Sequence, residues 1–104
     1  MAQWQWSSLK DAPVKELAKG IRIRPLWEVK HGARALVLEM DPESEFNELD
    51  HHDSGPEEVF VVSGIFNDGV RDYPAGTFIH APKGSSHVSR STTGCLLFVF
   101  YPEG

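Results

Sequence analysis

The chain has 104 residues and a formal net charge of −5, and hydrophobic and charged residues make up 40% and 24% of it. This length and composition are typical of one globular domain with a single core. The acidic balance and the absence of any run of Lys and Arg longer than two argue against nucleic acid as a partner. The single cysteine, Cys95, excludes an internal disulfide. With no apolar run of transmembrane length and no signal-peptide pattern, we expect a cytoplasmic protein without a membrane partner.

Residues 1–20 are predicted to form an N-terminal arm that packs on the domain formed by residues 21–104. Trp4 and Trp6 alternate with glutamines, so they would share one face of an extended segment. Asp11 and Pro13 are residues that begin a helical turn, which Gly20 would end. We therefore expect the arm to cover one end of a core.

From Ile21 onward, apolar residues repeat with a period of two and are interrupted by turn-forming residues. The predicted strands cover residues 21–29, 33–40, 46–52, 59–66, 70–73, 77–80, 87–90 and 95–101, with a bend at Gly64 inside the fourth. Short strands separated by turn signals, without a long helix, predict an all-β sandwich or a small antiparallel β-barrel.

Two adjacent histidines end the third of these strands. Because neighbouring residues of a regular strand point to opposite faces, only one of His51 and His52 is expected to point into the barrel. If His52 points in, Asp50 shares its face, and if His51 points in, Asp53 does, provided that the strand has not yet turned. A bulge would let both histidines reach one site.

Further metal-capable side chains occur where the following strands begin. Glu57 or Glu58 opens the next strand, which a hairpin returns to the side of the inward histidine. His87 follows the turn at 82–84 and can reach the same end of the barrel. Imidazole nitrogen and carboxylate oxygen atoms converging from a rigid sheet suit a divalent cation.

The same stretch resembles the two cupin motifs. Glu57 and Gly64 are separated by six residues, as in the second half of the first motif. Gly76, Pro82, Gly84 and His87 match the spacing of the second motif, in which Ser91 stands in place of the final Asn. The segments 55–58, 64–68, 73–77 and 94–95 are similar to the ChrR-type cupin domain, whose relatives include acetylacetone-cleaving dioxygenases.

The resemblance implies a cupin fold, which is a double-stranded β-helix of the jelly-roll, RmlC-like type. It also implies one divalent metal ion, Zn, Fe, Mn or Ni. The implied metal ligands are His51, His52, Glu57 and His87, and the implied pocket residues are Asp50, Asp53 and His80. The family's His-x-His is replaced here by Asp50-His51-His52-Asp53, so either Asp50 or Asp53 stands for one imidazole.

Two functions follow from the resemblance. In the first, the protein binds or acts on a small organic molecule at a His/Glu metal centre, with dioxygenase-type chemistry as one outcome. In the second, it is a non-catalytic, zinc-binding sensor or regulatory domain of the ChrR kind. A site with four protein ligands would be closed to substrate, whereas three ligands would leave an open position.

The closing strand also predicts a homodimer. Residues 95–101 are apolar on both faces, although a strand between a core and water should alternate apolar and polar residues. The strand at 59–62 is apolar on both faces as well. One short arm is not expected to cover both strands, so we expect a second copy of the chain to bury the remaining surface.

Overall fold

The computed structural model describes the backbone of residues 2–51 and 55–104, and the side chains of these residues except 47–51. The described residues form nine strands and no helix, and so contain no helix able to cross a membrane. The strands are β1 (Lys15–Ala18), β2 (Ile21–Glu28), β3 (Arg34–Met40), β4 (Ser44–His51), β5 (Glu57–Asn67), β6 (Asp72–Pro74), β7 (Phe78–Ala81), β8 (Ser86–Ser91) and β9 (Cys95–Tyr101). The all-β prediction is confirmed, and the predicted strands correspond to β2 through β9.

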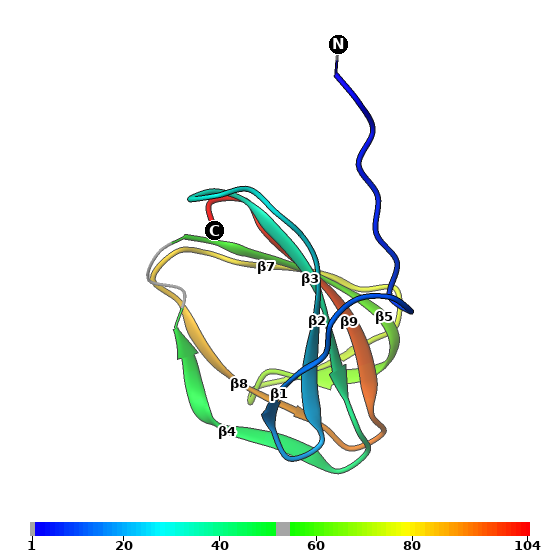
Figure 1. The fold of residues 1–104 in the computed structure, drawn as a ribbon. Coiled ribbons are helices and arrows are strands. Elements are labelled where there is room, and N and C mark those ends of the chain that lie inside the picture. Colours follow the sequence, from blue (N-terminus) through cyan, green and yellow to red (C-terminus); the bar gives the residue numbers. More distant parts are fainter. Residues whose placement is uncertain (1, 52–54) are drawn as a thin grey trace.

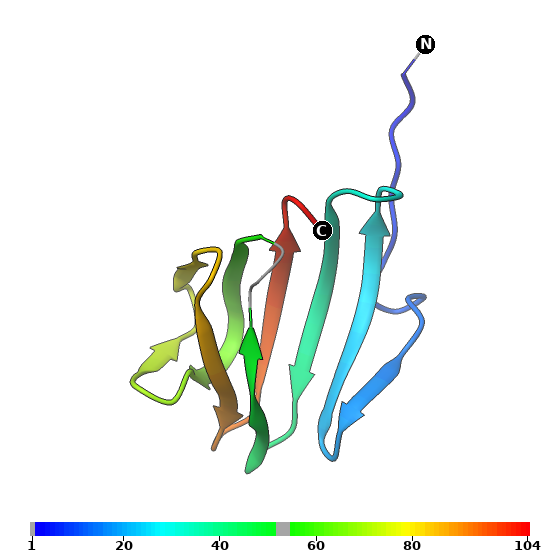
Figure 2. The same ribbon diagram turned by 90° about the vertical axis from the view of Figure 1, so that its left-hand side faces the viewer.

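All paired strands are antiparallel, in the order β1-β2-β3-β9-β5-β8-β4, and β6 and β7 also pair with β5. The first half of β5 pairs with β9 and β7, and its second half pairs with β6 and β8. The strands therefore form two sheets that share β5. These sheets curve around one interior as a nearly closed barrel (Figure 1 and Figure 2).

The bend at Gly64 carries β5 from one sheet into the other. Gly64 has a φ of 74°, and the register with β9 shifts between Val61 and Ser63. A Cβ atom on Gly64 would lie 2.8 Å from Cys95 Cα and would clash with the Gly94 carbonyl oxygen. Glycine is therefore required here both by its backbone conformation and by the close approach of the β8–β9 turn.

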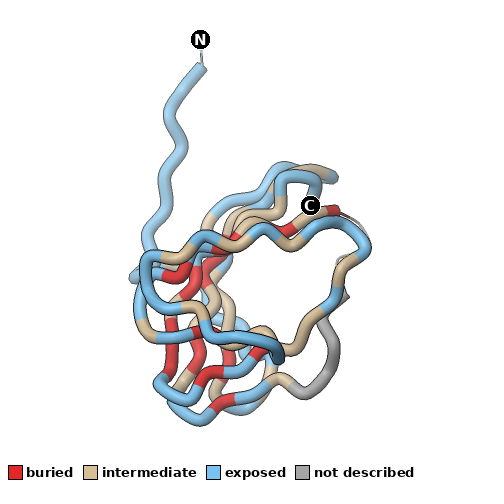
Figure 3. Tube along the Cα trace, turned by 180° about the vertical axis from the view of Figure 1, so that it is seen from behind, coloured by how far each residue is buried: buried red, intermediate tan, exposed pale blue. Residues whose placement is uncertain are grey.

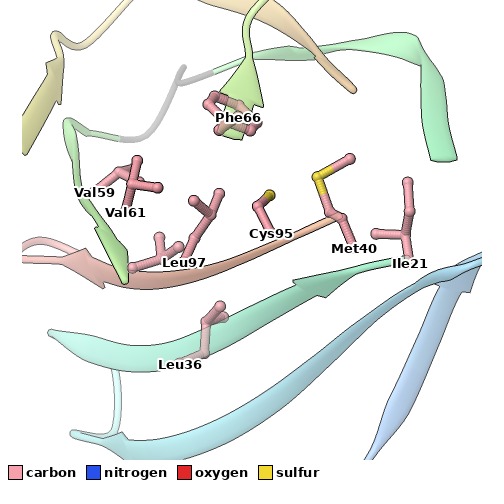
Figure 4. Close-up of a cluster of buried hydrophobic side chains, with 9 residues drawn as sticks. Ile21, Leu36, Met40, Val59, Val61, Phe66, Cys95 and Leu97 are labelled. Atoms are coloured by element: carbon pink, nitrogen blue, oxygen red, sulfur yellow. The ribbon is translucent and has the colours of Figure 1, made fainter. Parts of the chain in front are cut away.

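The core lies between the two sheets. Alternate residues of β9 point inward, and Leu97 and Val99 are 1% and 3% exposed. Phe66, from the second half of β5, closes the core from the opposite side (Figure 4). Cys95 is buried, as expected for a structural cysteine, and burial raises the pKa of its thiol. Figure 3 shows the buried residues along the strands and an exposed N-terminal segment.

The expected helical turn near residues 11–20 is wrong. A hydrogen bond from the Ser8 hydroxyl to Asp11 closes a short turn, and Lys15–Ala18 then forms β1, which pairs with β2. Gly20, with a φ of 78°, connects the two strands. An isolated helical turn is unstable in water, whereas pairing with the edge of an existing sheet satisfies the backbone groups of the segment.

The beginning of the segment before β1 projects beyond the two sheets (Figure 1). Trp4 and Trp6 are 90% and 89% exposed, and the contact of this segment with β2 includes a hydrogen bond of 2.7 Å from Trp27 Nε1 to Gln5 Oε1. The division into an arm of residues 1–20 and a domain of residues 21–104 stays a prediction, although β1 within that range belongs to the first sheet.

We predict that Gly64→Ala destabilises the fold far more than Gly76→Ala. Both positions have a positive φ, which costs any other residue about 1–2 kcal/mol. Only at Gly64 does the added methyl group also clash with backbone, and overpacking of this kind adds about 1–3 kcal/mol. Nothing lies within 4 Å of a Cβ at Gly76, which makes it the matched control. Urea unfolding measures both costs, and equal midpoints would contradict the role of Gly64.

Candidate metal centre

The candidate ligands lie at one end of the barrel. Glu57 is the first residue of β5, His87 is the second residue of β8, and β4 ends at His51. The backbone register places Asp50 opposite His87 and His51 opposite Ser86. Figure 2 shows these strand ends at the same end of the molecule. Three separate strands thus bring the motif residues to one place.

Glu57 and His87 face one another across the interior. The Glu57 residue is 5% exposed, and the His87 side chain is 16% exposed. His87 Nε2 lies 4.0 Å from Glu57 Oε1. Ligand atoms about 2.0–2.2 Å from a tetrahedral ion lie about 3.4 Å from each other, so a side-chain adjustment of about half an ångström would bring both atoms to a single cation. A buried carboxylate beside an imidazole therefore fits a divalent metal ion.

The hydrogen bonds of His87 select the nitrogen atom that is able to bind metal. His87 Nδ1 lies 2.8 Å from the Val88 carbonyl oxygen, which can only accept, so Nδ1 carries the proton. In the neutral imidazole the lone pair is then on Nε2, which lies 4.0 Å from Glu57 Oε1. The ring of Phe66 lies 6.1 Å from the His87 ring at 85°, an edge-on contact that restrains the orientation of the imidazole. Metal-binding histidines are commonly held in this way.

Two cavities adjoin the Glu57–His87 pair. The larger has a volume of about 360 Å³ and lies between the two sheets, and the smaller has a volume of about 190 Å³. Glu57, His87 and Phe66 line both cavities. The apolar residues that form the wall of the larger cavity include Ile23, Leu36, Leu38, Phe46, Leu97 and Val99. The pair thus stands at the boundary between a large apolar chamber and a smaller chamber.

A hydrogen-bonded pair lines the smaller cavity. Tyr73 Oη donates to Asp68 Oδ2 at 2.6 Å, and the backbone N–H groups of Val70 and Arg71 donate to Asp68 Oδ1 at 2.9 and 3.0 Å. Burial raises the pKa of Asp68, but these hydrogen bonds outweigh it and hold that pKa below its ordinary value of 3.8. Hydrogen bonding to Asp68, together with burial, raises the pKa of Tyr73.

The sequence motifs did not connect Asp68 and Tyr73 with the site. Both residues lie in segments that are similar to the ChrR-type cupin domain, 64–68 and 73–77, and neither was assigned a role. Tyr73 pairs with Phe66 across β5 and β6, so the hairpin brings Tyr73 next to the residue that restrains His87. An Asp in a hairpin turn, followed five residues later by a Tyr, was the available signal.

Several predicted site residues fall outside the described part of the structure. His52 and Asp53 lie outside the described residues, and the side chains of Asp50 and His51 are not among those described. Among the described side chains, no three His, Cys, Asp or Glu residues are grouped closely enough to hold a metal ion. The choice between His51 and His52 therefore stays a prediction. The pairing of β4 with β8 is irregular between Phe46 and Asp50 and is regular again at Asp50 and His51.

His80 has a partner on the outer side of the first sheet. Its Nδ1 lies 2.8 Å from Glu58 Oε1, and its side chain is 52% exposed. The residue also borders the smaller cavity. Its predicted role as a pocket residue stays a prediction. Glu57 is buried and lines both cavities, whereas Glu58 lines neither, so Glu57 is the residue that points into the interior.

The sequence pattern of the ChrR Cupin-like domain matches residues 3–103, nearly the whole chain. The chain belongs to the ChrR Cupin-like domain family. This agrees with the resemblance found in the motifs at Gly76–His87 and Glu57–Gly64. A comparison with curated proteins finds no match.

Solved structures share the cupin fold with this family member. An RmlC-like cupin from Shewanella frigidimarina is 20% identical with a TM-score of 0.81. The match covers 98% of this chain and 93% of the Shewanella chain. The anti-sigma factor ChrR of Rhodobacter sphaeroides, in complex with SigE, is 22% identical with a TM-score of 0.76. It covers 90% of this chain, which spans 50% of ChrR. A putative acetylacetone dioxygenase from Methylibium petroleiphilum is 15% identical with a TM-score of 0.81. The match covers 98% of this chain and 78% of the Methylibium chain.

We predict that the Tyr73–Asp68 contact stabilises the fold in a pH-dependent way. Because the pKa of Asp68 is lowered in the folded state, its contribution is present above pH 3.8 and is lost as the pH falls through the folded-state pKa. Tyr73→Phe should therefore lower the free energy of unfolding by about 1–2 kcal/mol at pH 7, and by less at pH 3. Urea unfolding at both pH values measures the difference. If Tyr73→Phe lowers the free energy of unfolding equally at both pH values, the charge of Asp68 does not contribute to the strength of this contact.

Proposed function

We propose that this cupin binds a divalent metal ion and binds or acts on a small organic molecule beside it. The observation that supports this most is the buried Glu57 carboxylate facing His87 Nε2, with both side chains lining an apolar cavity of about 360 Å³. In this proposal Glu57 and His87 supply two ligands. His51 and His52, or one of them with Asp50 or Asp53, complete the set, as the family motif implies.

The ion, Zn, Fe, Mn or Ni, would supply a Lewis acid and open positions for oxygen atoms of a substrate. The residues of the chain supply the remaining requirements. His87 presents Nε2 because Nδ1 is bound to Val88, and Phe66 restrains its ring. The apolar side chains of Leu36 and Leu97 line the chamber in which a substrate would lie. Similarity to a putative acetylacetone dioxygenase makes dioxygen-dependent cleavage of a β-diketone the first activity to test.

A second candidate is a non-catalytic, zinc-binding sensor or regulatory domain. It is supported by the family and by the likeness to ChrR, which is seen in complex with SigE. The two candidates differ in the number of protein ligands, because four would close the site and three would leave a position for substrate. The large apolar cavity next to Glu57 and His87 favours the first candidate.

The proposed function is tested by metal analysis of protein purified without chelator, followed by oxygen-consumption assays with acetylacetone. We expect about one divalent ion per chain and, for the iron-loaded form, oxygen uptake that depends on the diketone. Stoichiometric zinc with four protein ligands and no uptake would support the regulatory candidate. Protein that binds no divalent metal at micromolar concentration would contradict both.

Replacing His87 by Ala should remove most of the bound metal. Loss of a ligand should weaken binding by more than the roughly 10–100-fold that altering a neighbouring supporting residue costs. His80→Ala is the matched control, because it removes an imidazole near the same end of the barrel that is paired with Glu58 on the outer side. Plasma mass spectrometry of the two variants measures the difference. Equal metal content would show that His87 is a structural residue.

We also propose that the protein is a homodimer formed through the outer face of the first sheet. Cross-strand register places Phe78, Phe60, Phe98 and Val37 in one row across β7, β5, β9 and β3. Phe78, Phe60 and Phe98 are 63%, 43% and 37% exposed. In the described structure the tryptophans of the N-terminal segment do not cover this row, since both are almost fully exposed. A two-fold related copy would bury the row against itself.

Phe60→Glu should convert the protein to a monomer, because a charge at the centre of an apolar interface would be buried without a partner. Val70→Glu is the control, since Val70 is 83% exposed in the turn between β5 and β6, away from the row. Light scattering over a range of concentrations measures the mass. A monomeric wild-type protein at high micromolar concentration would contradict the dimer.

A further inference from the structure

Arg34 is a cation on the inner face of the first sheet. It begins β3, and the alternation of the strand places it on the same face as Leu36 and Leu38, with which it lines the larger cavity. Arg34 is exposed at the rim of the cavity, so a molecule entering from solvent can reach it. Its neighbours along β3 on this face, Leu36 and Leu38, are apolar, so the charge of Arg34 requires a reason.

The ring of Tyr101 holds the Arg34 guanidinium in place. The two residues are directly opposite each other in the pairing of β3 with β9, and the guanidinium carbon lies 4.2 Å from the centre of the Tyr101 ring. Stacking of this kind leaves the N–H donors at the edge of the guanidinium plane available. The planar fork of donors is the arrangement that binds a carboxylate through two parallel hydrogen bonds.

Arg34 differs from the other arginines of the strands in its partners. Arg22 pairs with Asp41 and Glu39, Arg24 pairs with Glu39, and Arg90 pairs with Glu45. Among the residues that the structure describes, no carboxylate forms an ion pair with Arg34. The outward-facing arginines of β2 are thus neutralised, whereas the described residues supply no carboxylate partner to the arginine at the cavity rim.

Arg34 lies at the same end of the barrel as the candidate metal centre. β9 separates β3 from β5, and its last residue, Tyr101, lies between the first residues of those strands, Arg34 and Glu57. Neighbouring strands are about 4.8 Å apart, so the starts of β3 and β5 are about 10 Å apart. A small molecule can span this distance, with one end beside Glu57 and His87 and the other at Arg34.

We propose that the larger cavity binds a small organic acid, whose carboxylate is held by Arg34 and whose hydrocarbon part lies against Leu36, Leu97 and Val99. The position of the other end of this acid, beside the metal centre, rests on the proposed function. The carboxylate site itself depends only on Arg34 and Tyr101. With this site, the expected ligand is no longer any small molecule but an apolar molecule with one acidic group.

The test compares benzoate with benzamide, which has the same shape without the charge, by calorimetric titration of the full chain. Wild-type protein should bind benzoate at least about 10-fold more tightly than benzamide. Arg34→Met should weaken benzoate binding at least about 10-fold and leave benzamide binding unchanged. Arg34→Lys, which keeps the charge but loses the planar fork, should give an intermediate value. If Arg34→Met does not fold, the lysine variant still tests the geometry.

Lys15 provides the matched control, because it also lines the larger cavity but lies on the edge strand β1. Lys15→Met should bind benzoate as the wild-type protein does. An equal loss in the Lys15 and Arg34 variants would overturn the proposal, because it would show a dependence on overall charge. Equal affinity for benzoate and benzamide, or no benzoate binding by the wild-type protein, would also overturn it. Metal content, measured in parallel, separates the hypothesis of a carboxylate site from the hypothesis of a metal centre. If the protein binds no metal but still binds benzoate in a way that depends on Arg34, the carboxylate site is supported and the metal centre is contradicted.

Discussion

The bend of β5 at Gly64 is the constraint on which the rest of the structure depends. It allows one strand to pair with β9 and β7 in the first sheet and with β6 and β8 in the second. The first half of the strand carries Glu57 and the second half carries Phe66. Because both halves face the same interior, the bend determines the position of a candidate ligand and of the ring that restrains His87. The same bend therefore joins the two sheets of the barrel and positions residues of the candidate site.

The two faces of the first sheet serve different purposes in this account. Its inner face forms the wall of the larger cavity and carries Arg34 at the rim. On its outer face, Arg22 and Arg24 form ion pairs with Glu39 near one edge, and a row of phenylalanines crosses the strands near the other. Outward-facing charges that are already paired favour contact with water, whereas an exposed aromatic row favours a partner. A cavity on one side and an interface on the other are compatible within one sheet.

The sequence predicted the barrel well because its signals are local. Alternating apolar residues and glycine-containing turns mark β2 through β9, and the Gly76–His87 spacing identifies the turn that positions His87. β1 was missed because its residues have no alternating pattern and gain stability only from pairing with β2. The Arg34–Tyr101 and Asp68–Tyr73 contacts depend on which residues become neighbours across strands, which short-range patterns do not specify. The choice between His51 and His52 stays undecided because the described part of the structure includes neither of their side chains.

The central claim is that Glu57 and His87 bind the same metal ion. An anomalous-scattering map, recorded at the absorption edge of the metal found by analysis, tests it most directly. The account predicts one strong peak at bonding distance, about 2.0–2.2 Å, from both Glu57 carboxylate oxygen and His87 Nε2. The number of further protein ligands at that peak distinguishes an open site from a closed one. A crystal of metal-loaded protein in which the peak lies elsewhere, or in which His87 Nε2 is hydrogen-bonded to Glu57 with no peak between them, would contradict the claim.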